Sequence, residues 1–195
     1  ARVLAPKPLQ LLKEQWEFQD ANWFPDFALT AQKIRWFWSK GGQPTLDGVI
    51  AVNASMLEKL LRITGPIEIR EFNKTVSADN VLAELQKSVE LEYDKTENQP
   101  KKIIGILMPK VLDRMRSSSQ EEALKYLNVF AEGLETKDIQ VWMAREDEQQ
   151  KVEEYRWAGR VAPTPGDALA VVEANIGGQK TDSVINERVL HEVEI

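Results

Sequence analysis

Residues 30–70 switch repeatedly between helical and strand periodicity, and this alternation constrains the fold more than any other feature of the sequence. Apolar residues recur at three- and four-residue spacing in the helical segments, whereas the strand segments are short and rich in Val and Ile. The order is helix, strand, helix and strand, over residues 30–40, 46–52, 55–64 and 66–70. Two strands joined by a helix predict a βαβ-like unit, with 46–52 as a buried strand.

Local signals set the predicted ends of the two helices. Thr30 is the expected N-cap of the first helix, and Gly41-Gly42 ends it. Ser55 and Glu58 have the spacing of a capping box, which would open the second helix. Gly65-Pro66 then stops that helix, because proline cannot continue it. Each helix is therefore bounded by residues that favour its start and its end.

The rest of the chain continues the mixture of helices and strands. Further helices are predicted over 78–93, 101–115, 117–135 and 145–159, and further strands over 139–143, 168–174 and 183–195. A kink or break is expected near Met108, because Pro109 lies inside the second of these helices. The order predicts an α/β (or α+β) fold: one mixed β-sheet, with helices packed mainly on one face.

Two of these later helices carry capping signals and apolar stripes. Ser77 is the expected N-cap of the helix over 78–93, and Ser118 with Glu121 forms a capping box for 117–135. The stripe that we expect to face the core in the latter helix comprises Leu124, Leu127, Ala131 and Leu134.

Composition limits the classes of protein to which the chain can belong. Its 195 residues suit a single domain, with residues 1–19 as an N-terminal arm and 20–195 as the core. There is no cysteine, which excludes disulfides, thiolate zinc sites and a cysteine nucleophile. The net charge of −6 argues against nucleic-acid binding, which needs a basic surface. No apolar run approaches the ~18 residues of a membrane span, and the start at Ala1 suggests a piece of a longer protein.

The segment DANWFPDF, residues 20–27, places polar side chains among aromatic ones. Asp20, Asn22 and Asp26 supply the carboxylate and amide oxygens that Mg²⁺ prefers, although their spacing is not that of a calcium loop. The alternative is structural: Asp20 and Asn22 would form Asx-turns, and Asp26 would cap the next helix. We expect the aromatic side chains of this segment to anchor it on the core: Trp23, Phe24 and Phe27.

The segment NIGGQKTD, from Asn175 to Asp182, is the second candidate for a polar site. Its Gly177-Gly178 pair permits positive φ, so that successive backbone N–H groups could form an anion nest. Lys180 would add charge for a phosphate, and Asp182 would orient it. The alternative is the tip of a β-hairpin that binds no ligand.

Asp47 and His191 each have a functional and a structural interpretation. Asp47 precedes a predicted strand and could point into a cleft, but Asp-Gly is a common turn pair, and we favour the turn. His191 is the only histidine, and we expect it to pack on the apolar side of the terminal strand. A histidine-based triad would have to use His191, and no serine lies in a G-x-S-x-G motif, so serine-hydrolase chemistry is disfavoured.

Trp36 and Trp38 lie on the first predicted helix, where an indole could stack on a sugar ring. Helical geometry points them about 200° apart, so at most one of them faces a given groove. We expect the other to lie in the core.

Four segments of the chain, in this order, resemble a bacterial family known only as domain of unknown function four thousand and twelve. They are DANWFPDFALTAQ, LDGVIAVN, LLRITGPIEI and VVEANIGGQKTD. The resemblance runs from about residue 16 to the C-terminus. It implies an extracytoplasmic domain of the bacterial cell envelope, whose parent protein is membrane-anchored.

The helix–strand–helix of residues 30–69 also resembles part of the LytR-CpsA-Psr fold. Enzymes of that fold transfer glycopolymers from a polyprenyl pyrophosphate carrier to the cell wall. The strands that carry their phosphate-binding Arg and Asp residues are not recognisable in this sequence, and an upstream stretch of the first family is missing as well. We therefore assign no catalytic residue, and whether the chain is an enzyme stays open.

Two hypotheses of function follow from these observations. In the first, the segments 20–27 and 175–182 converge at the carboxyl ends of strands and bind an anionic envelope glycan or a lipid-linked sugar phosphate, with Mg²⁺ as a candidate ion. In the second, the chain is a noncatalytic scaffold or protein-interaction module of the envelope. It would then expose an apolar patch or a sheet edge, on which another segment of the parent protein could dock.

Overall fold

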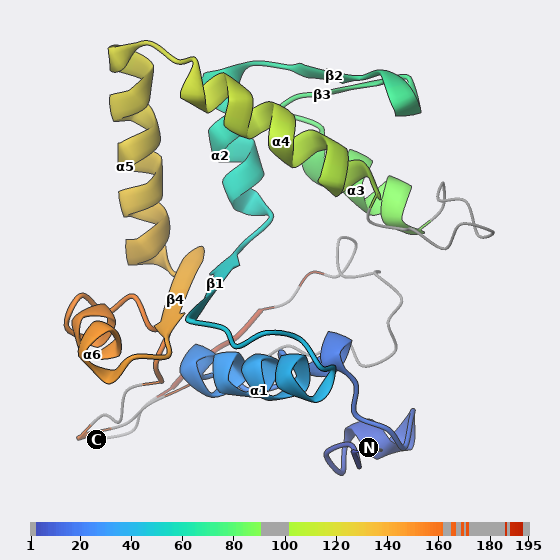
Figure 1. The fold of residues 1–195 in the computed structure, drawn as a ribbon, viewed down its shortest axis with the longest axis vertical. Helices are drawn as coiled ribbons and strands as arrows, with labels where there is room; N and C mark the ends of the chain where they lie inside the picture. The colour runs from blue at the N-terminus through green and yellow to red at the C-terminus, as the bar shows by residue number, and fades with distance from the viewer. Residues whose placement is uncertain are drawn as a thin grey trace. The chain divides into compact units, whose positions relative to one another are not determined.

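The computed structural model describes residues 3–90 and 102–161, with 165–166, 169, 171, 186 and 188–192. Helices in this part of the chain are α1 (Phe27–Lys40), α2 (Ser55–Thr64), α3 (Val81–Glu90), α4 (Lys102–Arg116), α5 (Gln120–Thr136) and α6 (Glu146–Glu154), as shown in Figure 1. Strands are β1 (Gly48–Val52), β2 (Ile67–Ile69), β3 (Lys74–Val76) and β4 (Ile139–Met143). Three 3₁₀ turns accompany them: η1 (Leu9–Leu11), η2 (Phe18–Asp20) and η3 (Arg70–Phe72).

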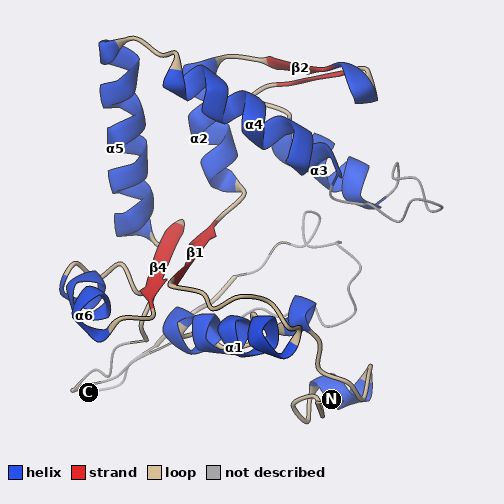
Figure 2. Cartoon of the chain, in the orientation of Figure 1, coloured by secondary structure: helices blue, strands red, loops and turns tan. Residues whose placement is uncertain are grey.

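The described strands form two small sheets, β1 with β4 and β2 with β3 (Figure 2). Two backbone hydrogen bonds flank the β1–β4 pair. Before β1 and after β4, Ala144 N–H donates to the Asp47 carbonyl, and after β1 and before β4, Asn53 N–H donates to the Asp138 carbonyl. The start of β1 therefore lies beside the end of β4, so the two strands are antiparallel. In the second, β2 and β3 are antiparallel and joined only through η3. The mixed α/β class is therefore confirmed.

The predicted βαβ-like unit is wrong, because β1 and β2 are not neighbours in a sheet. The short η3 turn lets β2 fold back at once on β3, and strands close in sequence usually pair in this way. The prediction that 46–52 is a buried strand is also wrong. Ile50 and Val52 of β1 are 65% and 58% exposed.

The chain divides by its internal contacts into two compact units. Unit 1 comprises Ala1–Val49, Trp142–Glu153 and Ala158–Ile195, and unit 2 comprises Ile50–Val141 and Glu154–Trp157. The expectation of a single domain with an N-terminal arm stays a prediction.

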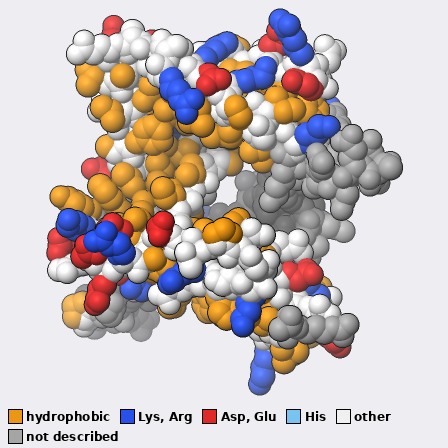
Figure 3. Space-filling view, viewed as in Figure 1, with side chains coloured by type: hydrophobic (Ala, Val, Ile, Leu, Met, Phe, Trp, Pro, Cys, Tyr) orange, Lys and Arg blue, Asp and Glu red, His pale blue; other side chains and the backbone are white. Residues whose placement is uncertain are grey.

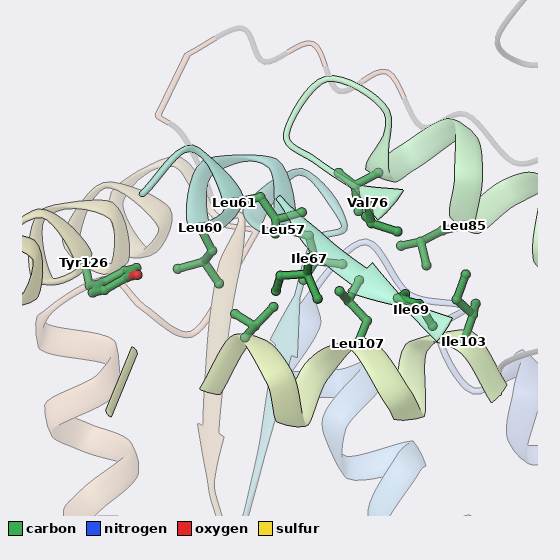
Figure 4. Packing of buried hydrophobic residues seen from close by; sticks show 12 residues of the cluster. Leu57, Leu60, Leu61, Ile67, Ile69, Val76, Leu85, Ile103, Leu107 and Tyr126 are labelled. Atoms are coloured by element: carbon green, nitrogen blue, oxygen red, sulfur yellow. The ribbon is translucent and has the colours of Figure 1, made fainter. Parts of the chain in front are cut away.

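Unit 2 contains an aliphatic core in which helices surround α2 and the β2–β3 hairpin. Within it, α2 packs against α3, α4 and α5, and α4 also packs on β2. Figure 4 shows Leu57, Leu60 and Leu61 of α2 pointing toward the residues of β2 and α4. Because α2 ends at Thr64 and Gly65 takes φ +74°, the chain turns directly into β2, as the Gly65-Pro66 signal predicts.

Helix α5 meets this core through a different face from the predicted one. Tyr126 and Gly133 are buried, whereas Leu124 and Leu127 are 57% and 63% exposed. A Cβ on Gly133 would lie 2.8 Å from Met56 Sδ, so this glycine is where α5 passes closest to α2. The predicted stripe is therefore wrong at Leu124, Leu127 and Ala131, which are all exposed, since close approach of α5 to α2 needs the glycine face.

Two predicted helix starts are shifted, and one predicted capping box is absent. The capping box of α5 is Ser119 with Glu122, one residue later than predicted. Helix α3 begins at Val81 rather than at residue 78. In α2, the Ser55 hydroxyl donates to the Asp138 carboxylate at 3.0 Å and makes no cap, so the predicted Ser55–Glu58 box is absent.

Two further boundaries differ from the sequence-based expectation. Helix α4 continues through Pro109 as one element, so no break occurs near Met108. Helix α6 ends at Glu154, earlier than the predicted end at Gly159. By contrast, β4 spans the predicted residues 139–143.

Unit 1 is organised around α1 and a set of aromatic side chains. The α1 residues Phe27, Ala28 and Ala31 are buried, and Phe27 N–H donates to the Gly159 carbonyl at 2.9 Å. Trp16 packs edge-on against the rings of Phe24 and Phe37, at centroid distances of 6.3 and 5.5 Å. The N-terminal arm contains η1, and η2 begins at its end.

Several predictions fall outside the described residues. They concern most of the strand over 168–174 and most of the strand over 183–195. Residues 188–192 are described and do not form a strand, and His191 among them is exposed rather than packed. None of the helices in the described ranges has both the length and the apolar character that a membrane span requires.

Candidate functional site

The carboxylate of Asp26 is engaged by its own chain. Leu29 N–H donates to Asp26 Oδ1 at 3.1 Å, which makes Asp26, rather than Thr30, the N-cap of α1. Val161 N–H donates to Oδ2 at 3.3 Å, and the Arg160 guanidinium lies 3.5 Å from Oδ1. Both oxygens therefore have partners, as the structural interpretation of this residue predicts.

Asp20 is also held locally. Its carboxylate forms an ion pair with Lys13 and accepts a hydrogen bond from Glu17 N–H at 3.2 Å. Asn22 and Asp47 are exposed, and the Asp47 carbonyl accepts from Ala144 N–H at 2.7 Å. Within the described ranges, no group of three or more acidic or histidine side chains is placed to hold a metal ion.

The aromatic side chains of residues 20–27 are packed to different degrees. Phe27 is buried, whereas Trp23 and Phe24 are half-buried. The remaining predicted site residues, Asn175, Lys180 and Asp182, lie outside the described part of the chain. The predicted ligand-binding role of all seven residues stays a prediction.

A groove beside α1 in unit 1 has the size and the lining of a ligand site. Its volume is about 540 Å³, within the range of ligand pockets. Five of its residues recur along one face of α1 at helical spacing, and the sixth comes from β4. The lining residues of this α1 groove are Gln32, Arg35, Trp36, Ser39, Lys40 and Trp142.

The cations of the α1 groove rest on indole rings. The Arg35 Cζ lies 5.8 Å from the ring centroid of Trp142, and the Lys40 Nζ lies 5.8 Å from that of Trp36. Lys33, next to the groove, also lies over Trp36, at 5.0 Å. These are cation–π distances, which hold the side chains near the surface of the groove.

Neither Arg35 nor Lys40 forms an ion pair with a carboxylate of the described residues. The Gln32 amide and Ser39 hydroxyl likewise make no side-chain hydrogen bond there. The groove thus presents two cations, two neutral hydrogen-bonding groups and two indole rings. Such a lining is suited to an anion that carries hydroxyl groups or a ring.

Sequence reasoning missed this site, although part of its signal is visible. The spacing of 32, 35, 36, 39 and 40 is that of one helical face. Trp36 lines the groove and Trp38 does not, which agrees with the prediction that at most one of them faces a groove. The contribution of Trp142 depends on a long-range contact that no local pattern shows.

Unit 2 contains a second polar arrangement, centred on Asp138. Its carboxylate accepts hydrogen bonds from Asn53 Nδ2, Ser55 Oγ, Lys59 Nζ and Thr136 Oγ1 at 3.0–3.1 Å. These donors, led by the Asn53 amide and Lys59, lower the pKa of Asp138 to about 2. Lys59 also pairs with Glu132 at 2.9 Å. We call these six residues the Asp138 cluster.

The Asp138 cluster has the features of a structural joint. It ties the start of α2 to the end of α5 and the start of β4, and every polar group in it has a partner. A carboxylate with four donors is already solvated by the protein and has little capacity left for a ligand. The α1 groove is therefore the stronger candidate for binding.

Comparison with protein families gives one match, which covers residues 4–89. Comparison with curated proteins and with solved structures gives no significant match. The matched residues contain α1 and the five lining residues that it contributes to the α1 groove. The matching family is described as protein of unknown function (DUF4012), and this match supports the assignment of residues 4–89 to that family.

Proposed function

We propose that this chain is an extracytoplasmic domain of a bacterial envelope protein, which binds an anionic glycan or a lipid-linked sugar phosphate in the α1 groove. The observation that carries the proposal is that the positive charges of Arg35 and Lys40 are not neutralised by a described carboxylate. Both face a groove, and neither has a carboxylate partner among the described residues. The envelope location rests on the family resemblance alone.

Arg35 and Lys40 have no carboxylate partner among the described residues, although the chain is rich in acidic residues. Acidic residues outnumber basic ones, 31 to 25, so carboxylates are plentiful. Elsewhere Lys59, Lys125, Arg145 and Arg160 all pair with acids. A cation held on an indole stays available to an incoming anion, because the ring attracts it without neutralising its charge. The groove therefore favours negatively charged ligands.

The rest of the lining suits a saccharide. Indole rings stack on the apolar faces of sugars, and the Gln32 amide and Ser39 hydroxyl can exchange hydrogen bonds with sugar hydroxyls. A volume of about 540 Å³ accommodates one or two sugar units rather than a long polymer segment. None of the lining residues forms a nucleophile–base pair, so the proposal is binding without an assigned reaction.

Titration of tryptophan fluorescence tests this proposal, because two indoles line the groove. The ligands are an acidic oligosaccharide and a polyprenyl phosphate sugar analogue, each with and without Mg²⁺. We expect saturable binding that Arg35→Gln combined with Lys40→Gln removes. The matched control is Lys151→Gln, which removes one positive charge from an exposed position of α6 in the same unit. Unchanged fluorescence and melting temperature with both ligands would contradict the proposal.

A second candidate function is a protein-interaction module of the envelope. Leu124 and Leu127 are exposed three residues apart on α5, and Figure 3 shows hydrophobic side chains gathered along this helix. Exposed apolar side chains on one helix favour a protein-interaction role. A photo-crosslinker at position 127 would then react with one partner in cells, and Leu124→Lys would abolish the product. The control is a crosslinker at the neighbouring exposed position Asn128, from which no product is expected.

A further inference from the structure

We propose that the α1 groove selects a dianionic phosphate group, such as a phosphate monoester, over the single charge of a carboxylate. This inference rests on the proposed function and specifies which anion the site recognises. An acidic glycan can carry either chemistry, as a uronic acid or as a sugar phosphate, and the lining of the groove distinguishes the two.

The first argument is charge balance. Arg35 and Lys40 contribute two positive charges to one groove, and no acidic residue lines it. A carboxylate would neutralise one of these charges and leave the other facing it without a partner. A phosphate monoester carries a charge between −1.5 and −2 near pH 7, so it can neutralise both cations.

The second argument is the order of the side chains around α1. Helical geometry places Arg35 and Lys40 about 140° apart around the axis and about 7.5 Å apart along it. Ser39, Gln32 and Trp36 lie between them in this projection. The cations therefore flank the groove, and neutral hydrogen-bond donors occupy its middle. Both cationic side chains are long enough to reach an anion placed between them.

The third argument is the number of acceptor oxygens that a phosphate and a carboxylate offer to the donors of the groove. The groove offers two cations, one hydroxyl and one amide, and none of these has an ion-pair or side-chain hydrogen-bond partner among the residues described. A monoester phosphate has three terminal oxygens arranged tetrahedrally, which can accept from donors that approach from several directions. The two oxygens of a carboxylate lie in one plane with its substituent and can satisfy fewer of these donors.

Arg35 is held more rigidly than Lys40, because its aromatic partner is buried. Its guanidinium lies over Trp142, and this indole is only 6% exposed, so the platform is part of the core of unit 1. A planar guanidinium held in this way can bind two phosphate oxygens at once, which a lysine cannot do. Lys40 rests on the half-buried Trp36 and can adjust its position as the ligand enters. Trp142 and Trp36 are thus positioning residues for the two cations.

A matched pair of sugars separates the two chemistries. Glucose 6-phosphate and glucuronate share a pyranose ring and differ in the anion at the same carbon. At pH 7.5 and constant ionic strength, calorimetric titration of the full chain is expected to give about tenfold tighter binding of glucose 6-phosphate. Arg35→Gln and Lys40→Gln should each weaken this binding about tenfold, and Arg35→Lys about fivefold, because the bidentate contact is lost.

The pH profile gives a second readout. A phosphate monoester takes up its second proton near pH 6, so binding of glucose 6-phosphate should weaken as pH falls from 7.5 to about 5.5. Glucuronate keeps its single charge over this range, and its weaker binding should not change. Lys151→Gln is the control, because it removes the same charge outside the groove and should change either affinity less than twofold, roughly the size of a long-range charge effect.

The results separate failure of this inference from failure of the proposed function. Glucuronate binding as tightly as glucose 6-phosphate, with both affinities lost in the Arg35→Gln variant, would overturn the selection of phosphate and leave an acidic-glycan site. No binding of either sugar, or binding that survives the Arg35→Gln/Lys40→Gln double substitution, would overturn both. Octyl phosphate is added as a lipid-like monoester. Tighter binding of octyl phosphate supports a lipid phosphate as the source, and tighter binding of glucose 6-phosphate supports a glycan phosphate.

Discussion

The α1 groove in unit 1 and the Asp138 cluster in unit 2 use the same kinds of side chain in opposite ways. Lys59 of the Asp138 cluster lies within 3.1 Å of two carboxylates, and Asp138 has four side-chain donors. In the α1 groove, Arg35 and Lys40 face aromatic rings and no described carboxylate. The first arrangement is neutralised within the protein, and the second presents uncompensated charge.

This difference separates polar groups that stabilise the fold from polar groups that are available to a ligand. A hydrogen-bond network in which every group has a partner contributes to stability, and much of that contribution is lost when one member is removed. An exposed cation on an indole contributes little to folding, so its removal should change binding and not stability. The comparison therefore predicts where substitutions will affect folding and where they will affect binding.

The largest expected effect on stability is at Asp138. Asp138→Asn places an amide among four hydrogen-bond donors and removes the charge that Lys59 faces. We expect a loss of about 2–3 kcal/mol in the free energy of unfolding, measured with urea, because hydrogen bonds to a charged group are lost together. Asp147→Asn is the control, since Asp147 is an exposed residue paired with Arg145. An equal loss in the two variants would contradict a structural role for the Asp138 cluster.

Substitution of Gly133 is expected to have the next largest effect on stability, and it tests how closely α5 packs on α2 in unit 2. A Cβ at this position would lie 2.8 Å from Met56 Sδ and 3.1 Å from Ile139 side-chain carbons. Gly133→Ala should therefore destabilise the chain by about 1–2 kcal/mol through overpacking, despite the better helix propensity of alanine. Gly105→Ala in α4 meets open space and should stabilise it by roughly 0.5–1 kcal/mol. Stabilisation by both substitutions would show that α5 does not approach α2 this closely.

Acid should weaken the Asp138 cluster selectively. The hydrogen bonds that lower the pKa of Asp138 to about 2 favour its charged form in the folded state. Its contribution is therefore complete above the unfolded pKa near 3.8 and is lost as pH falls from about 4 toward 2. The difference in unfolding free energy between the native chain and Asp138→Asn should shrink over this window. A difference that stays constant from pH 5 to pH 2.5 would contradict the lowered pKa.

The smallest effect on stability is expected in the α1 groove. Arg35 and Lys40 are exposed and make no described ion pair. The Arg35→Gln/Lys40→Gln double variant should unfold within about 0.5 kcal/mol of the native chain, as most surface substitutions do. A loss comparable to that of Asp138→Asn would mean that these cations support the fold, and the contrast between the two regions would disappear.

Local sequence signals predicted the elements of this fold better than their pairing. Gly65-Pro66 ends α2, and the Val- and Trp-containing segment 139–143 forms β4 as expected. Asp26 caps α1, which was one of the two interpretations of residues 20–27. These features depend on residues within one or two turns of each other, where backbone preferences decide the structure.

Long-range contacts decided the features that the sequence did not reveal. The four donors to Asp138 include Asn53, which is 85 residues away, and no local pattern links them. The same holds for Trp142, which completes a groove whose other lining residues are on α1. The spacing of Leu124 and Leu127 predicted that they face the core, but both are exposed, and the face of α5 that contains Gly133 packs on α2 instead. Close packing therefore overrode hydrophobic periodicity at this helix.

The central claim is that the guanidinium of Arg35 is held ready to bind an anion. Side-chain NMR of arginine Nε–H groups tests it directly, because each guanidinium gives its own signal. On addition of glucose 6-phosphate, the signal of Arg35 should shift saturably, and that of Arg145, which is already paired with Asp147, should stay in place. A shift at Arg145 as large as that at Arg35, or no shift at Arg35 at saturating ligand, would contradict the account.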